Sequence, residues 1–114
     1  MRKVIIQVER LSQGFERFQQ AWETGAPQGE FITFEDVETL LKTLTSKRWE
    51  LVSVLPKQGP MSIRALARAL GRDVKNVHTD VQALKEIGLV TDHPTGICVS
   101  YDEIEAHLVL KSAA

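Results

Sequence analysis

The 114-residue sequence contains a single cysteine, Cys98, which excludes an internal disulfide and a cysteine-rich zinc site. Its three histidines are scattered and form no His-x-x-x-His pair, which argues against a metal centre. No apolar run approaches the roughly 20 residues that cross a bilayer, and the apolar part of the amino terminus is too short for a signal peptide. We therefore expect a cytoplasmic protein with no metal and no other cofactor.

Catalytic signatures are also missing from the sequence. Asp102, Glu103 and Glu105 form an acidic cluster, but no nucleophile or base motif lies near them, so we interpret them as a solvated edge. Hydrophobic residues make up 43% of the chain and charged residues 25%, which suits one compact domain with extensions and a modest core. We expect a binding protein and not an enzyme.

Between residues 62 and 90 the sequence predicts two short amphipathic helices joined by a Gly-Arg turn. Ser62 is the expected N-cap of the first helix, about nine residues long, and Gly71 ends it. Asp73 caps the second helix, and Gly88 ends it. The apolar stripe of the first helix comprises Ile63, Leu66, Ala67 and Leu70, and that of the second comprises Val74, Val77, Val81 and Leu84. Two such helices with a short turn are typical of a helix-turn-helix.

The outer face of the second helix carries side chains that suit DNA recognition. Lysine, asparagine, histidine and threonine donate to or accept from base edges, which favours a helix lying in the major groove. The expected base-reading residues are Lys75, Asn76, His78 and Thr79, and the expected phosphate contacts are Arg64, Arg68, Arg72 and Gln82. The plainer alternative for Lys75, Asn76, Thr79 and Gln82 is the solvated face of an amphipathic helix. For His78, which lies at the boundary of the inward face, the alternative is a partly buried core histidine.

Positive charge is concentrated on this segment, although the whole chain has a formal net charge of −1. Residues 46–90 contain 8 Lys/Arg against 4 Asp/Glu, residues 1–45 contain 5 against 7, and residues 91–114 contain 1 against 4. The segment expected to meet phosphates is therefore basic, and its flanks are acidic. This positive excess is modest for one copy on DNA, which favours a homodimer.

After the second helix the sequence predicts a short β-hairpin. Residues 89–91 and 97–99 have the pattern of strands, and His93-Pro94-Thr95-Gly96 is the turn between them. We interpret Cys98, in the second strand, as a small apolar residue; a redox-sensing thiol is the alternative. The turn residues expected to reach the DNA backbone or minor groove are Thr95 and Gly96.

The amino-terminal half is expected to hold a strand and three helices. The expected elements are a strand over Lys3–Val8, a helix over Ser12–Thr24, a loop or short strand over Gln28–Phe34, a helix from Phe34 to about Leu44 capped by Thr33, and a helix through Trp49, Val52 and Leu55 that Pro56 closes. The helix that Thr33 caps should bury Val37, Leu40, Leu41 and Leu44. Aromatic residues concentrated in this half indicate either core packing or an interface.

The segment Tyr101–Leu110 fits a strand or a helix, and its alternating apolar residues favour a strand. We expect it to pair with Lys3–Val8, within the chain or across a dimer, because a lone strand leaves its backbone groups unpaired. The expected division is an N-terminal extension for dimerisation or partner binding over residues 1–44, a DNA-binding core over residues 45–100, and a C-terminal strand and tail over residues 101–114.

The segment Met61–Val99 resembles the winged helix-turn-helix regulators of the MarR and ArsR type, in which leucine, a few residues and then Gly-Leu-Val lead into a β-wing. Here that ending is Leu84–Val90. The string Gly71–Val81 is closer still to small prokaryotic predicted regulators, some of which serve as antitoxins beside a toxin gene. Further shared positions are Thr45, Arg48, residues 59–63 and residues 101–104. Thr79 stands where MarR- and ArsR-type relatives often have arginine, so their base preference is not carried over.

The residues and the resemblance together lead us to expect an α+β, mostly α, fold with a winged helix-turn-helix core and an N-terminal strand-helix extension. The expected function is sequence-specific binding of double-stranded DNA by a homodimeric repressor of its own small operon. Two alternatives stay open. In the first, an antitoxin masks a small basic toxin with its N-terminal half and represses the shared operon. In the second, the winged helix is a protein-interaction scaffold.

Overall fold

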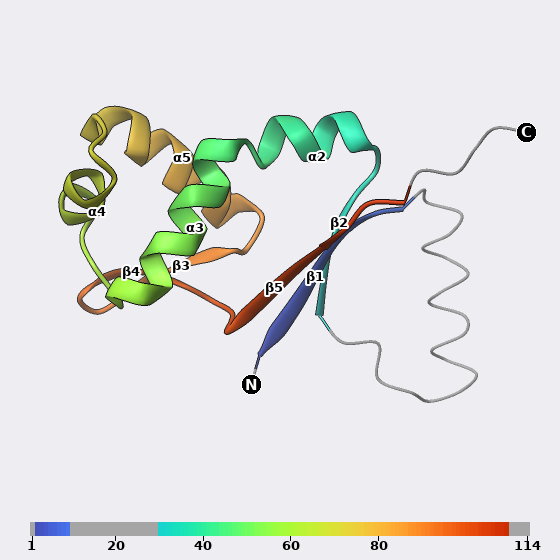
Figure 1. The fold of residues 1–114 in the computed structure, drawn as a ribbon. Helices are drawn as coiled ribbons and strands as arrows, with labels where there is room; N and C mark the ends of the chain where they lie inside the picture. Colours follow the sequence, from blue (N-terminus) through green and yellow to red (C-terminus); the bar gives the residue numbers. More distant parts are fainter. Residues whose placement is uncertain (1, 10–29, 110–114) are drawn as a thin grey trace, which may run out of the picture.

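The computed structural model describes residues 2–9 and 30–109, whose arrangement is shown in Figure 1. In chain order the elements are β1 (Lys3–Val8), β2 (Glu30–Phe34), α2 (Val37–Thr43), α3 (Ser46–Gln58), α4 (Ile63–Leu70), α5 (Val74–Glu86), β3 (Val90–His93), β4 (Gly96–Val99) and β5 (Glu103–His107). This is an α+β fold, in which α3, α4 and α5 lie to one side of the β1–β2–β5 sheet. The helix expected over Ser12–Thr24 lies outside the described residues.

The strand β1 is the centre of a parallel three-stranded sheet with the order β2-β1-β5. Its pairing with β5 confirms the strand over residues 103–107 and shows that the two segments meet within one chain. Of the segment 28–34, for which a loop or a short strand was expected, the described residues 30–34 form a strand. Val4 and Ile6, on one face of β1, are 0% exposed. Because β1 is paired on both sides, β2 and β5 are the edge strands of this sheet.

Helix α2 begins later than the sequence led us to expect. Thr33 and Phe34 belong to β2, and the N-cap is Asp36, which accepts a 2.7 Å hydrogen bond from the backbone N–H of Thr39. The expectation of a Thr33 cap is wrong because Phe34 continues the strand and is buried against the core. Aspartate is also at least as strong an N-cap as threonine, so the helix starts at the second candidate.

The inward face of α2 is narrower than the predicted stripe. Leu40 and Leu44 are each 2% exposed, as expected for residues four apart on one face. The expected burial of Leu41 is wrong, because its side chain is 56% exposed. A helix of seven residues presents one row to the core, and Leu41 is turned about 100° from Leu40 and about 60° from Leu44.

Helix α3 supplies much of the buried core. Thr45 caps it by accepting a 3.4 Å hydrogen bond from the backbone N–H of Arg48. Leu51 and Leu55 are 0% exposed. The expectation that Pro56 closes the helix is wrong by two residues, because Pro56 lies inside the last turn and α3 ends at Gln58. A proline this close to the end removes one backbone hydrogen bond and leaves little helix beyond it to disrupt.

The expected boundaries of α4 and α5 are confirmed. Ser62 and Asp73 cap the two helices by accepting backbone N–H bonds of 3.1 and 2.8 Å. Gly71 adopts the left-handed conformation, with φ 66°, where α4 ends. Gly88, with φ 87°, follows the C-cap of α5. These glycines adopt backbone angles that other residues rarely take, so both helix ends are fixed locally.

The inward face of α5 matches the predicted stripe except at its first residue. Val77, Val81 and Leu84 are 0% exposed. The expected burial of Val74 is wrong, because its side chain is 43% exposed. Its angular position fits the stripe. However, Val74 is the first residue of α5, and fewer neighbours cover a side chain at the beginning of a helix.

Strands β3 and β4 form an antiparallel hairpin connected by Pro94 and Thr95. His93 pairs with Gly96, so both belong to the strands and the turn is two residues shorter than expected. The hairpin is fixed to the segment before α4 by a reciprocal pair of backbone hydrogen bonds between Met61 and Ile97, at 3.1 and 2.9 Å. The expected placement of residue 89 in the first strand is wrong, since β3 begins at Val90.

Arg2 joins the ends of the three-stranded sheet. Its guanidinium lies 2.7 Å from Glu30 Oε1 and 4.7 Å from the centre of the Tyr101 ring, and its backbone N–H donates to Asp102 Oδ2 at 2.7 Å. The hydrogen bond from Arg2 lowers the pKa of Glu30. These exposed contacts hold the beginning of β1 between β2 and β5.

Candidate nucleic-acid interface

The residues expected to read bases lie on one exposed face of α5. Successive helical residues are turned by about 100°, so residues 75, 79 and 82 form a row, with residues 76 and 78 at its margins. The buried residues Val77, Val81 and Leu84 occupy the opposite face. The alternative of a partly buried His78 is wrong, because its side chain is exposed. The exposed set is Lys75, Asn76, His78, Thr79 and Gln82.

The start of α5 is held by local hydrogen bonds. The Asp73 side chain accepts from the backbone N–H of Lys75 at 2.8 Å, and the Thr79 hydroxyl donates to the carbonyl oxygen of Lys75 at 3.2 Å. Neither contact uses the amine of Lys75 or the amide of Asn76. The side chains of Lys75 and Asn76 therefore stay available for a ligand, while the two hydrogen bonds hold the backbone of the first turns of α5.

Helix α4 adds two exposed guanidinium groups. Arg64 and Arg68 are separated by four residues, so they lie on the same face of α4. Both side chains are exposed, whereas Leu66 and Ala67 on the inner face are at most 1% exposed. Helices α4 and α5 pack against each other. The pair thus presents two exposed cations on α4 together with the polar face of α5.

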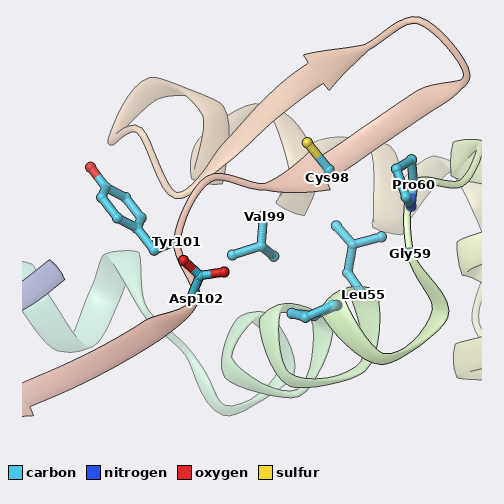
Figure 2. Close-up of a pocket in the computed structure, with 8 residues that line it drawn as sticks. Leu55, Gly59, Pro60, Cys98, Val99, Tyr101 and Asp102 are labelled. Atoms are coloured by element: carbon cyan, nitrogen blue, oxygen red, sulfur yellow. The ribbon is translucent and has the colours of Figure 1, made fainter. Parts of the chain in front are cut away.

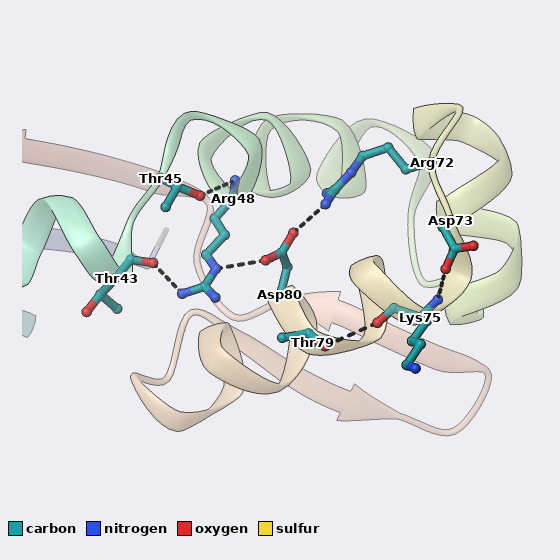
Figure 3. A network of polar contacts seen from close by, with 8 residues as sticks. All are labelled: Thr43, Thr45, Arg48, Arg72, Asp73, Lys75, Thr79 and Asp80. Atoms are coloured by element: carbon teal, nitrogen blue, oxygen red, sulfur yellow. Dashed lines mark hydrogen bonds and ion pairs between the residues drawn. The ribbon is translucent and has the colours of Figure 1, made fainter.

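The structure places Arg72 differently from these two arginines. Its Nη2 atom lies 2.8 Å from Asp80 Oδ2, and only 16% of its side chain is exposed. Arg48 contacts the other oxygen of the same carboxylate, with Nε donating to Oδ1 at 2.9 Å (Figure 3). Arg72 is therefore engaged inside the protein, and we leave it out of the interface surface.

Neither the buried position of Asp80 nor its contact with Arg48 was expected from the sequence. Asp80 falls on the buried stripe, three residues after Val77, and is 9% exposed. A carboxylate at such a position needs partners, because burying an unpaired charge is costly. The helical spacing of Asp80 relative to Val77 therefore indicated a carboxylate that needs partners. It did not identify them, because Arg48 lies 32 residues away in the sequence.

At the hairpin turn, Thr95 is exposed, as expected for a residue that reaches a ligand. Its backbone N–H donates to Nδ1 of His93 at 3.2 Å, which fixes the turn. Gly96 is half-buried, and a Cβ atom at this position would lie 2.3 Å from the carbonyl oxygen of Met61. The structure thus gives Gly96 a packing role at the base of the turn.

The cavity shown in Figure 2 is separate from the candidate interface. It has a volume of about 280 Å³ and lies between the end of α3, β4 and the segment before β5. Leu55 and Val99 give it an apolar lining, and Asp102 is a charged residue at its wall. Figure 2 shows the Tyr101 ring directed away from Leu55 and Val99. None of the residues expected to contact DNA lines this cavity.

Residues 2–9 and 30–109 contain no group of three or more His, Cys, Asp or Glu side chains placed to hold a metal ion. No helix within the same ranges is both long enough and apolar enough to span a membrane. Cys98 is half-buried in β4, where its sulfur lies 3.5 Å from the Thr91 hydroxyl.

The described fold is an α+β protein with a capped helix pair followed by a β-hairpin. The HVO_A0114 family model matches residues 43–106, from the end of α2 into β5. This span is more than half of the sequence, and the chain therefore belongs to the HVO_A0114 family. No curated protein matches the sequence. The family description states no activity, and the matched span contains every residue of the candidate interface.

Proposed function

We propose that the chain is a winged helix-turn-helix protein that binds double-stranded DNA in a sequence-specific manner. The observation that carries this proposal is the division of α5 into an apolar face, on which Val77, Val81 and Leu84 are fully buried, and an exposed polar face. The caps and the three-residue turn between α4 and α5 support it, because helix-turn-helix pairs are joined in this way. The β3–β4 hairpin would then be the wing.

In this proposal each contact has a defined role. The exposed face of α5 enters the major groove, where Lys75, Asn76, His78 and Thr79 meet base edges. Arg64 and Arg68 of α4, with Gln82, contact phosphates and set the register of the protein on the duplex. Thr95, in the hairpin turn, reaches the neighbouring backbone or minor groove. The basic segment between acidic flanks supplies the electrostatic attraction, and the protein acts as a repressor of its own operon.

The first prediction separates base reading from phosphate contact. Asn76→Ala is expected to weaken binding to the preferred site by about 1–3 kcal/mol and to relax base preference, because an amide contact to a base is lost. Arg68→Ala is expected to weaken all sequences similarly and to lower the salt dependence by about one phosphate contact. Both are measured by fluorescence anisotropy on a duplex selected from a random pool and on a scrambled duplex, over a salt series.

The matched control is Glu50→Ala, an exposed position on α3 outside the proposed contacts. This variant should retain the base preference of the unmodified protein. If Asn76→Ala and Arg68→Ala both bind like the unmodified protein, the assigned face of α5 and α4 is wrong. If the unmodified protein selects no sequence and shows no salt-sensitive binding, a protein-interaction scaffold becomes the better interpretation.

The second prediction concerns assembly. The β2-β1-β5 sheet, whose outer strands are β2 and β5, lies away from α4 in Figure 1, so a second copy could pair with an outer strand and leave residues 62–88 free for DNA. We expect a two-fold dimer by light scattering and a selected site that is an inverted repeat, with half-sites about 34 Å apart. A monomer at micromolar concentration that binds a single half-site tightly would contradict this.

A further inference from the structure

Asp80 is the meeting point of an ion-pair network at the middle of α5 (Figure 3). Its Oδ1 atom accepts a 2.9 Å hydrogen bond from Arg48 Nε, and its Oδ2 atom lies 2.8 Å from Arg72 Nη2. The side chains of these three residues are between 13% and 18% exposed. Both oxygens of one nearly buried carboxylate are thus held by cations from different parts of the chain.

The network connects α5 to three other segments. Arg48 belongs to the first turn of α3, and its Nη1 atom also donates to the carbonyl oxygen of Thr43, the last residue of α2, at 2.9 Å. Arg72 belongs to the turn between α4 and α5. One carboxylate therefore ties the middle of α5 to the end of α2, the start of α3 and the turn.

This arrangement restrains α5 in a way that its apolar contacts do not. Burial of Val77, Val81 and Leu84 is favourable but non-directional, so it tolerates small rotations of the helix about its axis. Hydrogen bonds and ion pairs to a carboxylate depend on distance and angle, and charge-assisted bonds are among the stronger ones. A rotation of α5 would move Asp80 away from at least one arginine.

We infer that Asp80, held by Arg48 and Arg72, is a positioning residue that sets the rotation of α5 and thereby the base preference of its exposed face. The inference rests on the proposed function. Asp80 directly follows Thr79 and lies four residues after Asn76, so its constraint acts on the turns that carry the base-reading side chains. Ion pairs of this kind need not raise stability, but they can select one arrangement of packed elements.

The charge of Asp80 gives the inference a second measurable consequence. Neither the buried Nη1 atom of Arg72 nor the Oδ2 atom of Asp80 has a hydrogen-bond partner among the described residues, so the contact between the two side chains is the 2.8 Å ion pair of Nη2 with Oδ2. Asp80→Asn removes one negative charge and keeps the shape of the side chain. Non-specific DNA binding should then rise, because it depends on net positive charge, while preference for the selected site falls. Simple unfolding would instead lower both affinities.

The experiment uses the full chain and two probes. A duplex is selected from a random pool by the unmodified protein, and a scrambled duplex of the same composition serves for comparison. We expect Asp80→Asn to lower the ratio of selected to scrambled affinity by about tenfold, equivalent to losing one good base contact. Glu50→Gln is the control, because it removes one negative charge from an exposed site outside the network and should leave the ratio unchanged.

Two conservative variants protect the test against a folding defect. Arg72→Lys and Arg48→Lys keep the charge but replace a planar fork by a single ammonium, so the geometry of the network changes while its charge does not. Both should lower the ratio with the melting transition retained by circular dichroism. An unchanged ratio in folded Asp80→Asn, or in both lysine variants if Asp80→Asn does not fold, would overturn the inference. A protein that selects no duplex would overturn the proposed function itself, and the inference with it.

Discussion

Replacing Val81 with aspartate is expected to unfold the protein at ambient temperature. Val81 is 0% exposed on the inner face of α5, where its neighbours in the row, Val77 and Leu84, are equally buried. An unpaired carboxylate at this position costs several kcal/mol, which is comparable with the roughly 5–15 kcal/mol that stabilise a small domain. Arg48 and Arg72 are not available to neutralise the new carboxylate, because each of them already contacts one oxygen of Asp80. Circular dichroism should show a lost or strongly lowered melting transition.

The matched control is Gln82→Asp, one residue further along the same helix. Gln82 is exposed, so the same carboxylate remains hydrated and stability should change by no more than about 0.5 kcal/mol. A Val81→Asp protein that melts cooperatively at the temperature of the unmodified protein would show that α5 is rotated relative to the core. The candidate interface would then have to be reassigned to another face of the helix.

Gly96→Ala is expected to separate the hairpin from the segment before α4. The new Cβ atom would lie 2.3 Å from the carbonyl oxygen of Met61, and the φ angle of 148° disfavours any residue with a side chain. Met61 cannot retreat without weakening its two backbone hydrogen bonds to Ile97. Backbone strain of this kind costs about 1–3 kcal/mol, and the lost hydrogen bonds add to it.

Urea denaturation and hydrogen exchange measure the two parts of this effect. The midpoint of unfolding should fall, and the backbone amide of Ile97 should lose protection before the buried amides of α3 do. Thr95→Ala is the control, because Thr95 is exposed in the adjacent turn and its backbone needs no change. If Gly96→Ala matches the unmodified protein in both measurements, the close approach of β4 to Met61 is wrong.

The features that sequence predicted well are fixed by neighbouring residues. Ser62, Gly71, Asp73 and Gly88 mark the ends of α4 and α5 through side-chain caps and positive φ angles, which need no tertiary contact. The short apolar run of β1 and the place of the hairpin turn, although not its length, are local in the same sense. The polar face of α5 followed from the helix period alone, once its apolar face was known.

The features that sequence missed depend on competition or on distance. Thr33 and Asp36 are both acceptable caps, and the choice between them is made by Phe34, which the core buries as part of β2. Leu41 and Val74 are apolar, but the sequence does not show whether other parts of the fold reach far enough to cover their side chains. The contact of Asp80 with Arg48 joins residues 32 positions apart and could not be read from local spacing. Without that network, nothing in the sequence indicated that Arg72 would pair with Asp80 and not with a phosphate.

The central position of β1 bears on the order in which the chain acquires its structure during synthesis. Arg2 and Asp102, which meet where β1 and β5 begin, are separated by 100 positions. Helices α3 to α5 are made of near neighbours and can form while the ribosome is still adding residues, whereas the second edge of β1 stays open until residues 103–107 emerge. The aliphatic side chains of Val4 and Ile6 would therefore wait longest for their final surroundings. A chaperone that shields β1 until residues 103–107 are available is therefore expected to raise the yield of folded protein.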